Sequence, residues 1–466
     1  MALMLANMNL SVFRENDIRG VAERDFPDDF VFQLGSAIGA HFRSVGAKTV
    51  TLGRDARLSS PRIHKVLQER LLASGLNVID LGIIHTPGLY FSVFHLEADG
   101  GVIITASHNP KDDNGFKIVR GRSTIYGEEI QQLKARVVEG RFDEMQNGPA
   151  GTVSYVDILT PYIDYIAANM LLGPKRPKVV LDAGNGTGGL SCLPLLRKLG
   201  FDVDPLYCEP DGLYPNHHPD PTVPENMADL VARVAQTGAE VGIALDGDAD
   251  RIGVVDARGR IVWGDQLLLL FARDILKEVP GATFVSEVKC SQSLFDEIEK
   301  LGGRAIMWKV GHSLIKVKMK EENALMAGEM SGHMFFKHRY FGFDDGVYTA
   351  ARLMELLSRS DKTFTELVDT LPVLFNTPEI RVDCPDELKR EVVRQAAEFF
   401  KQDHSVNELD GARIQFDGGW GLVRASNTGP VLVLRCEANS QERCDQIREE
   451  LECRLTLIRA GLAASA

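Results

Sequence analysis

Short apolar runs alternate with amphipathic helical patterns along most of this chain, and this alternation restricts its fold more than any other feature. In the first block, strand-like runs are followed by helical patterns. The strand-like runs are Thr49–Gly53, Val78–Leu81 and Gly101–Thr105, and the helical patterns lie near 61–75, 87–96 and 128–138. Such a rhythm is typical of α/β proteins built on parallel strands.

The same rhythm returns in two further blocks. The second has strand-like runs at Lys178–Asp182 and Val241–Leu245 with a helical pattern near 189–199, and the third has the runs Thr283–Val288, Arg304–Lys309 and Ala324–Ala327. A polar segment at 143–152, which contains Gly148, Pro149 and Gly151, predicts a linker after the first block.

The pattern changes after Pro372. The sequence there predicts a strand at Glu379–Val382, a helix over 386–402, a hairpin that turns at Asp417–Gly419, a strand at Val431–Arg435 and a closing helix. Asn439 followed by Glu442 predicts a capping box where that helix begins. We therefore expect an α/β protein with three similar mixed α/β domains and a smaller C-terminal α+β domain, and 466 residues suffice for four domains. The expected boundaries are 1–153, 154–258, 259–371 and 372–466.

The composition excludes several classes of protein. The chain has 52 Lys and Arg against 65 Asp and Glu, a net charge of −13, whereas nonspecific nucleic-acid binding needs a basic face. An anionic ligand must then be held by a local basic cluster against the overall field. The 7 cysteines show no CxxC spacing, so neither structural zinc nor a disulfide framework is expected. No basic residue precedes Arg14 and no apolar run approaches the roughly 18 residues of a membrane span, so we expect a cytoplasmic protein that binds neither membrane nor nucleic acid.

The segment Asp246–Arg251 carries the strongest chemical signal. It reads Asp-Gly-Asp-Ala-Asp-Arg and directly follows the run Val241–Leu245. The carboxylates project to one side only if the backbone stays roughly extended, because a helix would turn Asp248 away from Asp246 and Asp250. Oxygen ligands without His or Cys suit a hard cation such as Mg²⁺, and crowded carboxylates repel one another without a cation. A cation site is therefore predicted, with a solvated acidic turn as the alternative.

A serine hydroxyl is placed where α/β proteins bind their ligands. Residues 105–110 read Thr-Ala-Ser-His-Asn-Pro, directly after Gly101–Ile104. A loop at the carboxyl edge of a sheet is a usual binding position, and Pro110 prevents a helix there. Ser107 and His108 are neighbours, but adjacent side chains on an extended segment point apart. Taken alone, the segment is better explained as a plain turn.

Two more loops are rich in polar groups. Gly328–His333 follows a strand-like run and offers Glu329, Ser331 and His333, a set that suits a polyol or sugar. Arg424–Pro430 lies between two predicted strands and offers an arginine, two hydroxyls and an amide, which are the usual components of a phosphate cradle. A surface loop and an ordinary turn are the respective alternatives. Single basic residues in other loops are further candidates, although each alone is explained as a solvated charge: Arg19, Lys117, Lys289 and His312.

One motif points to a different activity. Gly184–Gly189 matches G-x-G-x-x-G after a strand, with Asp202, Asp204 and Glu209 about 20 residues further on, as in dinucleotide-binding proteins. A nicotinamide-dependent sugar oxidoreductase would use this segment, but it would leave the acidic, serine and arginine loops unexplained. The structural alternative is a glycine-rich turn that lets a strand and a helix pack closely.

Four segments, in this order and spacing, resemble the α-D-phosphohexomutase superfamily over nearly the whole chain: Thr105–Pro110, Asp246–Arg251, Gly328–His333 and Arg424–Pro430. Within it, Glu329–His333 and Phe335–Leu356 are most similar to the bacterial phosphomannomutase/phosphoglucomutase branch. The phosphoglucosamine mutase branch typically has Gln at the position of Met330 and is the alternative.

The resemblance implies four domains around a central active-site cleft and a role for each candidate residue. Ser107 would be a phosphoserine, and it would hold one Mg²⁺ per chain together with Asp246, Asp248 and Asp250. Arg19, Lys117, Arg251 and His333 would lie near the transferring phosphoryl group, with Lys117 and His333 as the candidate general acid and base. The implied substrate contacts are Glu329, Ser331, Lys289, His312, His108, Arg424, Ser426, Asn427 and Thr428.

The implied reaction interconverts the 1-phosphates and 6-phosphates of glucose and mannose through a hexose 1,6-bisphosphate. Hexose phosphates would be the only small-molecule partners, and a monomer is expected, with a dimer as the alternative. Asn16 stands where relatives often have Tyr, and Gly429 where they often have Glu or Thr, so these two positions depart from the pattern. A non-catalytic sugar-phosphate sensor that keeps the cleft is a further hypothesis.

Overall fold

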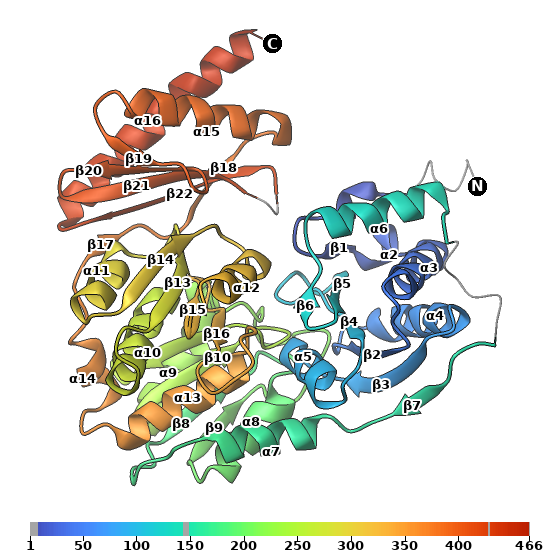
Figure 1. Ribbon diagram of the computed structural model, residues 1–466. Helices are drawn as coiled ribbons and strands as arrows, with labels where there is room; N and C mark the ends of the chain where they lie inside the picture. Colours follow the sequence, from blue (N-terminus) through green and yellow to red (C-terminus); the bar gives the residue numbers. More distant parts are fainter. Residues whose placement is uncertain (1–7, 143–148, 427–428, 466) are drawn as a thin grey trace. The chain divides into compact units, whose positions relative to one another are not determined.

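The computed structural model describes residues 8–142, 149–426 and 429–465, which form mixed sheets covered by helices (Figure 1). The chain divides into two compact units, the first made of 1–274 with 331–369 and the second of 275–330 with 370–466. The division runs through helix α10 (Gly264–Glu278), so the third predicted block contributes to both units. Most of the predicted linker, residues 143–148, lies outside the described residues.

The first unit begins with a mixed sheet in the order β1-β5-β4-β2-β3-β7, with β6 beside β5. Its strands are β1 (Ile18–Val21), β2 (Thr49–Arg54), β3 (Asn77–Ile83), β4 (Gly100–Ile104), β5 (Asp113–Arg120), β6 (Ser123–Thr124) and β7 (Val153–Tyr155). Strands β4, β2, β3 and β7 are parallel, whereas β5 returns antiparallel beside β4. The carboxyl ends of β2 and β4 therefore lie at one sheet edge, where the loop of Ser107 begins.

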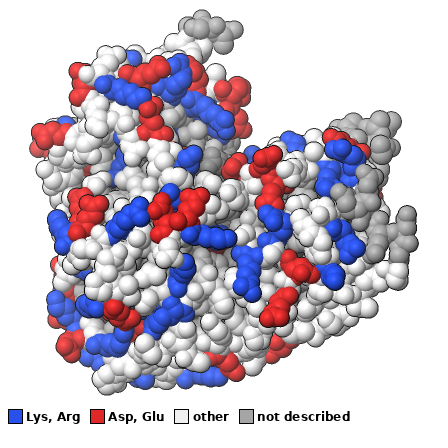
Figure 2. All heavy atoms as spheres, viewed as in Figure 1, with Lys and Arg blue, Asp and Glu red and all other residues white. Residues whose placement is uncertain are grey.

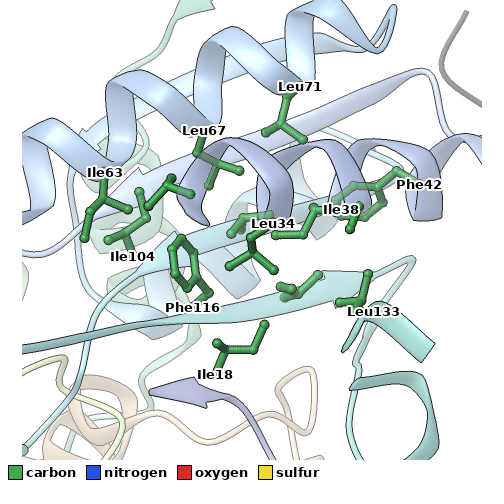
Figure 3. Packing of buried hydrophobic residues seen from close by; sticks show 14 of the residues in the cluster. Ile18, Leu34, Ile38, Phe42, Ile63, Leu67, Leu71, Ile104, Phe116 and Leu133 are labelled. Carbon is green, nitrogen blue, oxygen red and sulfur yellow. The ribbon is translucent and has the colours of Figure 1, made fainter. Parts of the chain in front are cut away.

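Helices of this part pack on the sheet through apolar residues with helical spacing. They are η1 (Leu10–Val12), α2 (Ala22–Asp25), α3 (Asp28–Ser44), α4 (Ser60–Ala73), α5 (Thr86–His95) and α6 (Glu128–Glu139). Figure 3 shows Leu34, Ile38 and Phe42 of α3 beside Ile63, Leu67 and Leu71 of α4, in one cluster with Ile104 and Phe116 of the sheet. Steps of four residues place these side chains on one helix face, and each buried side chain of this size contributes about 1.5–3 kcal/mol.

The second sheet of this unit carries the acidic segment. Its order is β12-β11-β10-β8-β9, from β8 (Val179–Asp182), β9 (Val203–Leu206), β10 (Val241–Leu245), β11 (Ile252–Asp256) and β12 (Ile261–Val262). The helices and the strand β16 that complete the unit are α7 (Leu159–Asn169), α8 (Gly189–Lys198), η2 (Pro224–Met227), α9 (Ala228–Thr237), β16 (Met334–Phe336), α13 (Gly346–Arg359) and α14 (Phe364–Val368). Strand β10 is parallel to β8 and antiparallel to β11, so the acidic segment is a hairpin turn.

The second unit combines three parallel strands with an antiparallel sheet. The parallel strands are β13 (Thr283–Glu287), β14 (Arg304–Trp308) and β15 (Met326–Gly328), with helices α11 (Gln292–Lys300) and α12 (His312–Glu321). The antiparallel sheet has β17 (Phe375–Asn376), β18 (Ile380–Asp383), β19 (Ser405–Asn407), β20 (Ala412–Phe416), β21 (Gly419–Ala425) and β22 (Val431–Ala438). Helices α15 (Asp386–Phe400) and α16 (Gln441–Ser465) lie together on one face of it (Figure 1). The predicted combination of mixed α/β domains and a C-terminal α+β domain is confirmed.

The predicted capping box is wrong by one residue. The Ser440 hydroxyl, not the Asn439 side chain, accepts the hydrogen bond from the Arg443 amide, at 3.2 Å. The reason is that the backbone N–H of Asn439 donates to the Gly418 carbonyl at 3.0 Å. Asn439 therefore still belongs to the hairpin, and the helix can begin only after it.

On the face shown in Figure 2, Lys and Arg side chains are interspersed with Asp and Glu. Among the described residues, no helix combines the length and the apolar character needed to cross a membrane.

Candidate active site

Ser107 lies in the loop that follows β4, and its backbone is held in the left-handed region with a φ of 50°. That conformation is uncommon for a residue with a side chain and persists only where the surroundings impose it. The Ser107 amide donates to the Thr105 hydroxyl at 2.9 Å, and the buried Arg57 guanidinium donates to the carbonyls of Ser107 and Asn109 at 2.8 and 2.7 Å. The loop is therefore fixed by the protein, with the serine side chain buried.

The left-handed conformation also changes the relation of Ser107 to its neighbour. The Ser107 hydroxyl lies 3.1 Å from His108 Nδ1, although adjacent side chains on an extended segment would point apart. The expectation of an extended segment is therefore wrong at this position. Burial, together with the charges of Arg251 and Arg19, lowers the pKa of His108 well below its ordinary value, so the imidazole is neutral near pH 7.

The segment Asp246–Arg251 is the turn between β10 and β11. The prediction that its carboxylates converge on an extended backbone is wrong, because the Ala249 amide donates to the Asp246 carbonyl at 3.0 Å and Ala249 has a φ of 59°. The turn nevertheless brings the three aspartates together, with one oxygen of each within 4.8 Å of the others. The Ser107 hydroxyl donates to Asp246 Oδ2 at 2.7 Å. Two segments that are far apart in the sequence thus meet in one buried site.

Two glycines make this meeting sterically feasible. A Cβ on Gly247 would lie 2.4 Å from the Ser107 carbonyl oxygen, and a Cβ on Gly186 would lie 2.7 Å from the Gly247 carbonyl oxygen. The amide and the hydroxyl of Thr187 both donate to that same Gly247 carbonyl, at 3.1 and 3.2 Å. The segment Gly184–Gly189 therefore packs against the acidic turn, and this close approach explains its glycine at 186.

Cationic side chains surround the three carboxylates. Lys117, on β5, contacts Asp250 Oδ2 and donates to Asp248 Oδ2 at 2.7 Å. The Arg251 Nε donates to Asp246 Oδ2 at 3.0 Å, and its amide donates to Asp246 Oδ1 at 3.1 Å. The predicted proximity of Lys117 and Arg251 to the acidic turn therefore follows from direct contacts.

The carboxylates respond differently to these partners. Burial raises the pKa of Asp246, and the charges of Asp250 and Asp248 act in the same direction against Arg251. Burial acts to raise the pKa of Asp248 as well, but the ammonium group of Lys117 and the hydrogen bonds from Lys117 and Thr86 hold it far below its ordinary value. The Asp248 carboxylate is thus firmly ionised, whereas the raised pKa of Asp246 makes it easier to protonate than an ordinary aspartate.

Within the acidic turn, two buried carboxylate oxygens accept no hydrogen bond from the described residues. They are Asp248 Oδ1 and Asp250 Oδ1. A buried carboxylate oxygen with no donor is costly unless a cation offsets its charge. Three carboxylates and a serine oxygen are the oxygen ligands that Mg²⁺ prefers. The residues present therefore fit a bound Mg²⁺.

Arg19 and His333 lie at the edge of this group. Arg19, on β1, donates from Nε to Asp17 at 2.6 Å and from Nη1 to Asn109 Oδ1 at 3.0 Å, which places its guanidinium on the serine loop. His333 forms a backbone bridge with Arg251, and its Nδ1 lies 3.1 Å from Asp344 Oδ2 and 3.7 Å from Asp250 Oδ1. Ser331 belongs to the same unit and is half-buried.

The remaining predicted residues that the structure describes lie in the second unit, where several of them belong to a second polar cluster. The buried Glu329 accepts a hydrogen bond from the Gly311 amide at 2.8 Å, directly before His312, the first residue of α12. Lys289 follows β13 and donates to Glu379 at 3.1 Å. Burial acts to lower the pKa of Lys289, but the carboxylates around it, Glu287 first, raise it overall. A protonated ammonium group is therefore held inside this cluster.

Asp410 connects the phosphate-cradle segment to the same cluster. Its Oδ2 accepts from Arg424, on β21, at 3.2 Å and from the Val310 amide at 2.8 Å. Ser426 is buried, and its carbonyl accepts from Lys389 at 2.6 Å. The predicted contacts Asn427 and Thr428 lie outside the described residues.

Sequence reasoning missed several residues of the site. Arg57 holds the serine loop, Thr86 donates to Asp248 Oδ2 at 2.5 Å, and Asp344 contacts His333. Arg57 and Thr86 follow the parallel strands β2 and β3. The loops at the carboxyl ends of parallel strands are usual binding positions, and this rule, which predicted the Ser107 loop after β4, could have found them too. Asp344 precedes a helix and carries no comparable signal.

Comparisons with known proteins bear on the whole chain. The family models for phosphoglucomutase/phosphomannomutase domains I, II, III and the C-terminal domain match residues 10–144, 160–259, 263–375 and 379–452. The phosphomannomutase/phosphoglucomutase of Pseudomonas putida is 45% identical over 97% of each chain, and the phosphoglucomutase of Neisseria gonorrhoeae is 44% identical over 96% of this chain and 97% of its own. A phosphoglucomutase/phosphomannomutase family protein of Burkholderia thailandensis has a solved structure with a TM-score of 0.90 and 39% identity, covering 97% of this chain and 99% of its own. With all four domain models matched in order and relatives this similar over almost the full length, the chain belongs to the phosphoglucomutase/phosphomannomutase family of phosphohexomutase enzymes.

Proposed function

We propose that this protein interconverts the 1-phosphates and 6-phosphates of glucose and mannose through a phosphoserine at Ser107 and a hexose 1,6-bisphosphate intermediate. The observation that carries the proposal is the 2.7 Å hydrogen bond from the Ser107 hydroxyl to Asp246, inside a buried group of three carboxylates. A serine hydroxyl in contact with an acidic turn that could hold a cation suits phosphoryl transfer, where the main need is to offset negative charge. The relatives from Pseudomonas putida and Neisseria gonorrhoeae, a phosphomannomutase/phosphoglucomutase and a phosphoglucomutase, support this substrate class.

The reaction consists of two phosphoryl transfers. In the first, a free sugar hydroxyl oxygen forms a bond to the phosphorus of phosphoserine, and the bond from phosphorus to Ser107 Oγ breaks. A general base takes the proton of the sugar hydroxyl, and a general acid returns a proton to Ser107 Oγ. After the bisphosphate turns round, its other phosphoryl group passes back to Ser107 by the reverse chemistry. Lys117 and His333 are the candidates for acid and base, and which residue takes which role is open.

One Mg²⁺ per chain would be held by Asp246, Asp248, Asp250 and Ser107. When bound, it supplies positive charge that offsets the charge on the phosphoryl group. Arg251 and Arg19 hold fixed guanidinium groups at the acidic turn and at the serine loop, and His108 provides a neutral imidazole beside the serine.

Glu329 and Ser331 would accept hydrogen bonds from sugar hydroxyls. Arg424 and Ser426 would bind the phosphate that does not react, as would Asn427 and Thr428. Lys289 and His312 would make further contacts with the ligand. Glu329, Lys289 and Arg424 are buried or nearly so, as expected for groups that exchange water for a ligand.

The protein is proposed to act as a cytoplasmic monomer with domain boundaries at 1–153, 154–258, 259–371 and 372–466. The four matched segments support a division of this kind. Light scattering of the purified protein tests the oligomeric state, with a dimer as the contradicting result.

The decisive experiment compares Ser107→Ala with Ser74→Ala, a buried serine at the end of α4. We expect Ser107→Ala to lose glucose 1-phosphate conversion and the phosphate-sized addition seen in the intact mass of the wild type, while Ser74→Ala keeps both. Full activity of Ser107→Ala would contradict the proposal. A wild-type protein with neither turnover nor phosphate would indicate the sugar-phosphate sensor.

Substrate choice is tested by parallel kinetics with glucose, mannose and glucosamine 1-phosphates. We expect higher kcat/KM for glucose and mannose, and a preference for glucosamine 1-phosphate would assign the chain to the alternative mutase branch. Fluorescence titration with a reduced nicotinamide cofactor should show no saturable binding, because the Gly184–Gly189 segment packs on the acidic turn.

A further inference from the structure

Thr86 makes two contacts to one residue of the acidic turn. It is the first residue of helix α5 and is fully buried. Its hydroxyl donates to Asp248 Oδ2 at 2.5 Å, and its amide donates to the Asp248 carbonyl at 3.0 Å. Thr86 therefore holds both the side chain and the main chain of a residue 162 positions away in the sequence.

These contacts divide the two oxygens of Asp248 between different partners. Oδ2 accepts from Thr86 and, at 2.7 Å, from Lys117, whereas Oδ1 is buried and accepts from no described residue. Rotation of a carboxylate about its last torsion angle is only weakly restricted by its own covalent structure. Lys117 alone does not fix this angle, because its ammonium group is shared with Asp250. The hydroxyl of Thr86 is the second donor, and among the described residues Asp248 is its only partner.

Thr86 itself is held in place by the start of its helix. The preceding His85 accepts from the Gly88 amide at Nδ1, at 2.9 Å, and its Nε2 lies 2.7 Å from the Ser191 hydroxyl on α8. Burial lowers the pKa of His85 to about 3, so the ring is neutral near pH 7. With Nδ1 accepting, a neutral ring carries its proton on Nε2 and donates to Ser191. The start of α5 is thereby tied to α8, and the position of Thr86 is set independently of Asp248.

From this geometry we infer that Thr86 is a positioning residue for the metal ligand Asp248: its hydroxyl holds Oδ2 so that Oδ1 is presented to the cation. The inference rests on the cation site proposed above. Partners that orient a metal ligand are worth about 10–100-fold in metal affinity when removed. Thr86 lies on helix α5, which accompanies the first sheet, whereas Asp248 follows strand β10 of the second sheet.

The test measures binding of Mn²⁺, as a spectroscopic substitute for Mg²⁺, by electron paramagnetic resonance on the full-length protein without substrate. Thr86→Val keeps the shape of the side chain but removes the donor, and we expect its Mn²⁺ Kd to rise about 10–100-fold. Thr86→Ser keeps the donor and should retain the wild-type Kd within about threefold. Thr187→Val is the matched control, because it removes a buried threonine hydroxyl that donates to the same turn, at the Gly247 carbonyl and not at a carboxylate.

An unchanged Kd in Thr86→Val would overturn the inference, and so would an equal rise in Thr187→Val, which would indicate general loosening of the turn. Circular dichroism confirms folding of each variant, and Thr86→Ala replaces Thr86→Val if the valine side chain prevents folding. Asp248→Asn separates this inference from the proposed cation site. If Asp248→Asn binds Mn²⁺ as the wild type does, the site itself is wrong. If it loses binding while Thr86→Val does not, only the role of Thr86 is wrong.

Discussion

Lys117 bridges the carboxylates of Asp248 and Asp250, with its Nζ 2.7 Å from Asp248 Oδ2. Burial acts to lower the pKa of Lys117, but the charges of Asp248 and Asp250 raise it above its ordinary value, so the ammonium group stays protonated. This one ammonium group contacts two of the three buried carboxylates, so its single charge offsets only part of theirs. Lys117 and a bound cation would therefore both offset the negative charge of the acidic turn.

Replacing Lys117 should lower the stability of the metal-free protein more than that of the Mg²⁺-bound protein. We expect Lys117→Met to lower the free energy of unfolding by about 3–5 kcal/mol in EDTA, because a buried carboxylate loses its partner. Added Mg²⁺ should raise the melting temperature of the variant more than that of the wild type. Differential scanning calorimetry with and without Mg²⁺ measures both. Lys198→Met is the control, since Lys198 pairs with Asp164 at an exposed position, where a salt bridge is worth about 0–1 kcal/mol. Equal losses in the two variants would contradict the charge-sharing role.

Gly247→Ala should separate the serine loop from the acidic turn. The new Cβ would lie 2.4 Å from the Ser107 carbonyl oxygen, and backbone cannot move as freely as a flexible side chain. We expect a loss of about 1–3 kcal/mol of stability and a large fall in kcat. Gly461→Ala, in helix α16, should be neutral or slightly stabilising, because no described atom beyond its chain neighbours and its own helix backbone lies within 4 Å of the new Cβ. Urea unfolding and steady-state kinetics test both variants, and a fully active Gly247→Ala would show that the close approach is dispensable.

The buried His85 should make stability depend on pH. Its pKa is lowered to about 3 in the folded protein by burial, whereas an exposed histidine has a pKa of about 6.5. The folded state therefore binds fewer protons than the unfolded state between these values. Stability is fully present above pH 6.5 and is lost as the pH falls toward 3, by about 2 kcal/mol between pH 6.5 and 5.

Urea unfolding at pH 7, 6 and 5 measures this loss. His85→Gln should show a flatter pH dependence than the wild type, while His95→Gln, on the exposed side of the same helix, should keep the wild-type slope. The role of His85 is wrong if all three proteins lose stability in parallel.

Arg413 should affect substrate binding without contacting substrate. Its Nη1 donates to the carbonyls of Val288 and Cys290, at 2.7 and 3.1 Å, on both sides of Lys289, and its guanidinium stacks on Trp420 at 3.8 Å from the ring centroid. We expect Arg413→Gln to raise the KM for glucose 1-phosphate severalfold because the Lys289 turn loses its support. Phosphorylation of Ser107, measured by intact mass, should not change. Arg394→Gln, on the exposed face of α15, provides the control, and an unchanged KM in Arg413→Gln would count against the support role.

The sequence predicted strands and helices well where a short range of residues determines them. The run Val241–Leu245 is observed with the predicted bounds, and the helix predicted near 128–138 is Glu128–Glu139. Apolar periodicity reports which face of one element is buried, and that property is local. The three aspartates do converge, but not for the predicted reason, because the segment is a turn with Ala249 at positive φ and not an extended backbone.

What the sequence by itself determined is thus the order of strands and helices and the polar segments at strand ends, because both depend on neighbouring residues. Only the tertiary structure decided which oxygen of Asp248 is held by Thr86, that Arg57 fixes the Ser107 loop, and that the Gly184–Gly189 segment packs on the acidic turn. These contacts join residues far apart in the chain, and the hydrogen-bond direction and close packing that define them arise only when the sheets are assembled.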